Sequence, residues 1–150
     1  MTLETNVAGE PVDGSRDLVL VAVRGMAAAV LLGTAAVLFV LWGVRVLVAG
    51  AAPSDGPVSG PALVLLVGGT LLALFASAGT AWACLSPIDS YYRRGGLALV
   101  CAFATFVMSV LAAPLHHFFG QDALLGIGAG ALAGGVLLFR LSSTDRHGAS

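Results

Sequence analysis

The chain has 150 residues, of which 58% are hydrophobic and only 10% are charged, and its mean hydropathy is +0.97. Soluble domains carry about 25% charged residues, so this composition excludes an ordinary soluble domain and predicts a polytopic membrane protein in a lipid bilayer. The net charge of −1 offers no basic face, so we expect no nucleic-acid partner. All seven basic residues are arginines and small apolar residues abound, a bias that we interpret as a GC-rich bacterial genome.

The chain begins with a polar, acidic segment and then becomes apolar. Residues 1–17 contain four acidic residues and a proline, which predicts a disordered tail. The first apolar run, residues 25–44, is bracketed by Arg24 and Arg45. Twenty residues of helix measure about 30 Å, the thickness of the hydrocarbon core of a bilayer. Because apolar residues continue on both sides, we predict a helix over residues 18–48, with both arginine side chains reaching the interface.

Three further apolar runs predict three more spanning helices. Pro61 suits the first turn of its helix, Pro114 marks the end of the next, and Asp122 is a suitable N-cap for the last. Residues 141–150 then form a short cytoplasmic tail. The predicted spans are residues 61–85, 92–113 and 122–140. The predicted fold class is therefore all-α, a four-transmembrane-helix bundle that occupies residues 18–140.

The distribution of arginines predicts the orientation of the bundle. If the N-terminus is inside, six arginines share its side of the membrane and only Arg45 lies on the other side. Positively charged residues favour the cytoplasmic side, so we predict both termini in the cytoplasm (N-in, C-in) and a bacterial cytoplasmic membrane location. The six arginines are Arg16, Arg24, Arg93, Arg94, Arg140 and Arg146.

Small residues recur at every fourth position in each apolar run, a pattern that supports close helix crossings in membranes. The pattern includes Gly126, Gly130 and Gly134, where three glycines each lower helix propensity. Packing within one chain and a seam for a partner or a second copy both remain open as explanations. The other stripes are Gly25, Ala29 and Gly33; Gly69, Ala73, Ser77 and Ala81; and Cys101, Thr105, Ser109 and Ala113.

The four apolar runs, residues 25–44, 61–85, 95–113 and 123–139, contain no ionisable residue other than the two cysteines, which argues against two classes of membrane protein. Proton-coupled pumps use carboxylates or histidines within the membrane, and a haem held between helices needs axial histidines there. No Ser/His/Asp order or nucleotide motif occurs, so we expect a non-enzymatic protein without a cofactor. Cys84 and Cys101 have no metal-type spacing, and we expect them to be reduced and structural.

The adjacent histidines His116 and His117 form the one candidate metal site, on the predicted extracytoplasmic face beside Asp122 and Asp55. Neighbouring residues point about 100° apart on a helix, so one ion would not easily take both imidazoles. The alternative is that the sequence His-His-Phe-Phe lies in the headgroup layer, where amphipathic rings are favourable.

The segment between the second and third runs is the most polar internal stretch. Tyr91 and Tyr92 fit the aromatic belt of a membrane, and Arg93 and Arg94 fit anionic headgroups. We predict that these four residues contact lipid or, alternatively, form a cytoplasmic docking surface for a protein partner.

Three functional hypotheses remain. The first is an accessory or structural subunit that packs against a larger membrane assembly or against itself. The second is a small oligomeric channel or carrier for a neutral solute, with a path lined by hydroxyl residues. The third is a metal or redox site at His116 and His117. The hydroxyl residues of the second hypothesis are Thr34, Thr70, Ser77, Thr80, Thr105 and Ser109.

Overall fold

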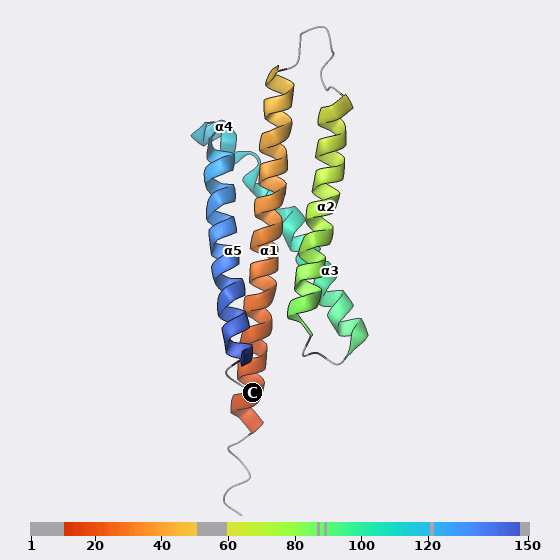
Figure 1. The fold of residues 1–150 in the computed structure, drawn as a ribbon, viewed down its shortest axis with the longest axis vertical. Helices are drawn as coiled ribbons and strands as arrows, with labels where there is room; N and C mark the ends of the chain where they lie inside the picture. The colour runs from red at the N-terminus through yellow and green to blue at the C-terminus, as the bar shows by residue number, and fades with distance from the viewer. Residues whose placement is uncertain (1–10, 51–59, 87, 89, 121, 148–150) are drawn as a thin grey trace, which may run out of the picture.

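The structure is a computed structural model that describes residues 11–50, 60–86, 88, 90–120 and 122–147. Within these residues the chain is helical and contains no strand (Figure 1). Four of the helices are long and apolar enough to cross a membrane. The predicted all-helical class with four long apolar helices is therefore confirmed, whereas insertion into a membrane and the orientation of the termini remain predictions.

The first and last helices of the chain are longer than predicted. Helix α1 covers Pro11–Gly50, so residues 11–17, which we placed in a disordered tail, are helical. Proline is favoured in the first turn of a helix, which explains a start at Pro11. Helix α5 covers Ala123–His147 and continues into the predicted C-terminal tail. The hydroxyl groups of Ser142 and Ser143 donate to carbonyl oxygens three residues earlier, so these polar residues are accommodated within the helix.

The two middle helices match the predicted spans to within one residue. Helix α2 covers Gly60–Cys84 and helix α3 covers Tyr91–Ala112. After Pro114 the chain forms the short helix α4, Leu115–Phe119, which we did not predict. Gly120 then adopts a φ of 89°, a left-handed conformation that glycine tolerates, and turns the chain toward α5.

Helix α1 is the centre of the arrangement. It packs against α2, α3 and α5, whereas α5 packs along α1 and beneath α4. Figure 1 shows α5 and α2 on opposite sides of α1, with α3 crossing behind them. The four long helices therefore form a bundle organised around one shared helix rather than a ring of equal neighbours.

The core is built mainly from small side chains. Large fully buried residues are few, and Leu38, Leu85 and Leu124 are the main examples among the described residues. Because small residues let helix backbones approach closely, van der Waals contact between backbones supplies much of the cohesion of such a bundle. The buried alanines are Ala28, Ala29, Ala35, Ala62, Ala73, Ala81 and Ala98.

Two glycines of α5 provide a matched test of this packing. A Cβ atom at Gly135 would lie 2.8 Å from Cγ of Leu32 and 3.2 Å from its backbone nitrogen, whereas a Cβ atom at Gly130 would meet nothing within 4 Å. We expect Gly135→Ala to lower the free energy of unfolding in detergent by about 1–3 kcal/mol through overpacking. We expect Gly130→Ala to raise it by up to about 1 kcal/mol through helix propensity. Equal effects of the two substitutions in denaturant titrations would contradict this orientation of α5.

Candidate functional site

The hydroxyl groups of Ser77 and Thr105 form a polar contact where α1, α2 and α3 meet. The Ser77 Oγ atom donates to the carbonyl oxygen of Ala29 at 3.1 Å and lies 2.8 Å from Oγ1 of Thr105. Thr105 Oγ1 also lies 2.9 Å from the carbonyl oxygen of Cys101. Each hydroxyl has one proton, so a chain from Thr105 to Ser77 to Ala29 satisfies both donors and links the three helices.

Gly33 makes this contact possible. A Cβ atom at position 33 would lie 2.7 Å from Cβ of Ser77 and 2.8 Å from Cγ2 of Thr105, so no larger residue fits without displacement. Ser77 and Thr105 are 1% and 0% exposed. The glycine therefore brings three backbones close enough for two hydroxyl groups to bridge them.

Most of the hydroxyl residues that we proposed as the lining of a solute path are buried or form hydrogen bonds within the bundle. Thr34 and Ser109 are buried as well, and the Ser109 Oγ atom donates to the carbonyl oxygen of Thr105 at 2.7 Å. The Thr80 hydroxyl donates to the carbonyl oxygen of Ala76 in its own helix. Thr34 Oγ1 is the one buried side-chain oxygen or nitrogen without a hydrogen-bond partner in the described residues. This arrangement favours structural roles for these residues over the lining of a path.

A second polar cluster lies at the connection between α2 and α3. The Arg94 Nε atom donates to the carbonyl oxygen of Trp82 at 2.8 Å, and the Arg94 guanidinium carbon lies 4.6 Å from the centre of the Trp82 ring. The Tyr91 ring meets the Trp82 ring edge to face, with centroids 4.8 Å apart. The last carbonyl groups of a helix lack partners within the helix and favour positive charge, so Arg94 stabilises the end of α2.

The other two residues of this segment point away from the bundle. Tyr92 is 93% exposed and Arg93 is also exposed. Ser90 is the N-cap of α3 but makes no side-chain capping hydrogen bond. The structure thus divides the predicted lipid or partner contacts into a pair that contacts Trp82 (Tyr91 and Arg94) and a pair that does not, although the Tyr91 side chain is itself 74% exposed. The sequence indicates that these residues lie at a membrane interface but not that Arg94 stacks on a tryptophan twelve residues earlier.

The histidine pair lies in α4, beyond the end of α3. The His117 backbone N–H bonds to the carbonyl oxygen of Pro114, and Phe118 and Phe119 are strongly exposed. Among the residues that the structure describes, no three His, Cys, Asp or Glu side chains come together as metal ligands. The His116 side chain and Asp55 are not among the described parts, so the metal site at His116 and His117 stays a prediction.

The two cysteines are buried packing residues. A Cβ atom at Gly25 would lie 2.7 Å from Cβ of Cys84, so this thiol residue packs directly against α1. Cys101 belongs to a small buried cluster with Ala29 and Ala81. Both are thiols outside any disulfide, and burial of this kind is usual for structural cysteines.

Helices α2 and α5 place their small residues differently. On α2, Gly69 would bring a Cβ atom to 2.8 Å from a Val40 methyl group, and Ala73 and Ser77 are buried, so all three face the bundle. On α5, Gly128 and Gly135 face α1, whereas Gly126 and Gly130 are exposed and Gly134 makes an ordinary contact with Leu31. The predicted stripe of three glycines thus lies largely outside the contact with α1.

No family model matches the chain, and no curated protein or solved structure matches it either. A helical fold by itself specifies no activity, because unrelated functions share the same architectures. We therefore infer function from the residues of this chain alone, and above all from the surfaces that its own helices leave uncovered.

A double-mutant cycle tests the contact between Ser77 and Thr105. We expect Ser77→Ala and Thr105→Val each to lower the free energy of unfolding by about 1 kcal/mol, with a coupling of roughly 0.6 kcal/mol, as is usual for hydrogen bonds between membrane helices. Thr80→Ala is the control, because its hydroxyl bonds only within α2, and we expect a smaller effect. Denaturant titration in detergent measures the two single variants, their double variant and the control. Strictly additive effects in the double variant would argue against a direct hydrogen bond.

Proposed function

We propose that the chain is an integral membrane protein with four spanning helices, and that it serves as a non-enzymatic accessory or structural subunit. In this role it packs laterally against a larger membrane assembly or against a second copy. Large apolar side chains cover the outer surfaces of the long helices, which supports contact with lipid or with other apolar helices. The hydroxyl groups inside the bundle are used to join helices, which supports a structural role.

The observation that carries this proposal is the outer surface of α5. Gly126 and Gly130 lie one turn apart on it, and a Cβ atom at either would meet nothing within 4 Å. Glycine costs about 1 kcal/mol relative to alanine inside a helix, so two such positions need a compensating role. Glycines four residues apart allow another helix to approach closely in a membrane. A seam for a second helix is therefore a better explanation of these positions than contact with lipid tails.

We also propose that both termini lie in the cytoplasm of a bacterial cell. In Figure 1 the start of α1, the connection from α2 to α3 and the end of α5 lie at the same end of the bundle. Arg24, Arg93, Arg94 and Arg140 belong to these regions, whereas Arg45 lies near the opposite end of α1. This separation of charge supports an orientation with the arginine-rich end inside.

Labelling of single cysteines tests the orientation. In a Cys84→Ala, Cys101→Ala background, we expect a membrane-impermeant maleimide to label Ser54→Cys on intact cells. Ser86→Cys should react only after the membrane is permeabilised, because it lies on the arginine-rich end. The opposite pattern, or equal labelling of the two positions, would contradict the proposed orientation.

Replacement of the outer glycines tests the subunit role. We expect the native chain, extracted gently from its own membrane, to appear in native mass spectrometry as part of a heavier complex. The double variant Gly126→Leu, Gly130→Leu should shift at least tenfold toward the bare chain, since two leucines would prevent close approach of a helix. Gly68→Leu is the matched control, because Gly68 also faces open space, on α2. A native chain that runs only as a monomer, or a double variant that keeps its complex, would contradict the proposal.

A further inference from the structure

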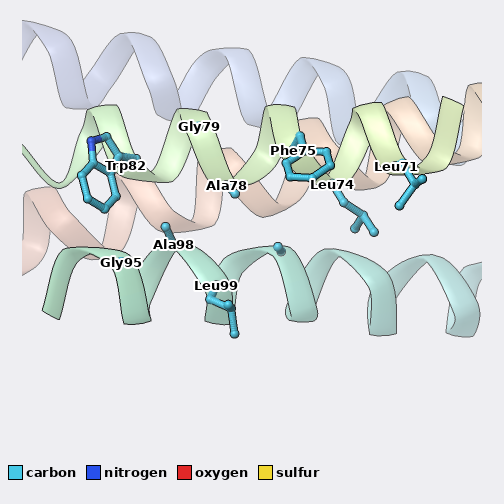
Figure 2. Close-up of a pocket in the computed structure, with 10 residues that line it drawn as sticks. Leu71, Leu74, Phe75, Ala78, Gly79, Trp82, Gly95, Ala98 and Leu99 are labelled. Atoms are coloured by element: carbon cyan, nitrogen blue, oxygen red, sulfur yellow. The ribbon is translucent and has the colours of Figure 1, made fainter. Parts of the chain in front are cut away.

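An apolar groove of about 590 Å³ lies between α2 and α3. Figure 2 shows the Trp82 ring and the Ala98 side chain directed into the space between the two helices. Phe75 and Leu99 stand beside the groove and are 74% and 71% exposed, so no described part of the chain covers them. Small residues line much of the groove, namely Ala78, Gly79, Gly95, Ala98 and Ala102.

The length of the groove matches one leaflet of a bilayer. Along α2 it extends from Trp82 to Leu71, which corresponds to about 16 Å at a rise of 1.5 Å per residue. One leaflet contributes about 15 Å to a hydrocarbon core of about 30 Å. In a membrane the groove would therefore extend from the interface, where Trp82 lies, to the midplane.

The lining of the groove suits a hydrocarbon chain. It is an open groove between two helices, and the large side chains beside it are apolar and exposed. A flexible acyl chain fits this space, and the lining is almost entirely apolar.

Positive charge gathers at one end of the groove only. Trp82 closes that end, and the Arg94 guanidinium lies over its ring, while Arg93 beside it is exposed. Within the described residues neither arginine pairs with a carboxylate, and Ser90 leaves the first turn of α3 without a side-chain cap. Two arginines at the positive end of a helix are complementary to a phosphate group.

We propose that this groove binds one anionic phospholipid molecule. One acyl chain lies between α2 and α3, the phosphate of the headgroup pairs with the Arg94 guanidinium that lies over Trp82, and Arg93 adds a second positive charge at the same end of the groove. The site rests on the membrane location proposed above, but it requires neither a protein partner nor a second copy. The site combines positive charge with a long apolar groove. A lipid would use both features, whereas a free phosphate would use only the charge and an uncharged solute only the groove.

Fluorescence quenching by brominated lipids tests the site in the full-length chain. The sequence contains two tryptophans, so Trp42→Phe leaves Trp82 in the groove as the only one. In vesicles that carry bromine on the acyl chains of phosphatidylglycerol, we expect stronger quenching of Trp82 than with equally brominated phosphatidylcholine. The expected preference is about fivefold in relative association for each arginine that engages the headgroup.

Two variants, each with a control, test whether the quenching of Trp82 depends on the groove and on the two arginines. We expect Gly79→Leu to reduce the quenching by both lipids, because a side chain at this unobstructed position would fill the groove, and Gly68→Leu to leave it unchanged. Arg93→Gln with Arg94→Gln should abolish the preference for the anionic lipid. Arg45→Gln, at the opposite end of α1, should retain it. Far-UV circular dichroism confirms that each variant keeps its helices.

The outcomes separate this proposal from the proposed membrane role. Quenching by both lipids to the same extent shows a chain that enters the membrane but has no anionic lipid site, and overturns only the present proposal. No quenching by either lipid contradicts membrane insertion and overturns both proposals. Displacement of the anionic lipid by soluble glycerol phosphate would overturn the role of the acyl chain, since a free phosphate would then suffice.

Discussion

The close approach of α1 to α2 and α3 is the contact on which the rest of the bundle depends. It exists because Gly25, Ala29 and Gly33 present almost no side chain to the neighbouring helices. In a lipid environment water does not drive helices together, so cohesion must come from backbone proximity and from hydrogen bonds such as that between Ser77 and Ala29. The apolar groove lies between α2 and α3, the two helices that this surface of α1 holds.

The opposite side of α1 uses the inverse arrangement. There α1 supplies large side chains, among them Leu32 and Leu38, and α5 supplies Gly135 and Gly128 to receive them. Helix α1 therefore has two different packing surfaces. Small residues face α2 and α3, and leucines face α5. Because α5 rests on α1 and has little other support, its outer surface is free to be used without disturbing the other three helices.

Much of the fold follows from the sequence, because apolar run length determines the spans and the recurrence of small residues predicts close packing. The sequence did not predict which side of α5 faces α1. Glycines occur at positions 126, 128, 130, 134 and 135, and a glycine has no side chain whose polarity or size would indicate a direction. The stacking of Arg94 on Trp82 is likewise a product of the turn between two helices, and no short-range pattern encodes it. Helix α4 was missed because a proline that ends one helix can also begin the next.

The length of α1 has a consequence for how it lies in the membrane. Its apolar part, Asp17–Gly50, measures about 51 Å, whereas Arg24 and Arg45 are only about 31 Å apart along the axis. If the two arginines mark the borders of the hydrocarbon core, exposed apolar residues such as Leu18 and Val46 extend beyond both borders. Matching the whole apolar length to a core of about 30 Å would need a tilt greater than 40°, outside the usual range. Helix α1 would thus cross the core with little tilt, and the exposed apolar turns beyond the two arginines would lie in the headgroup layers of both leaflets.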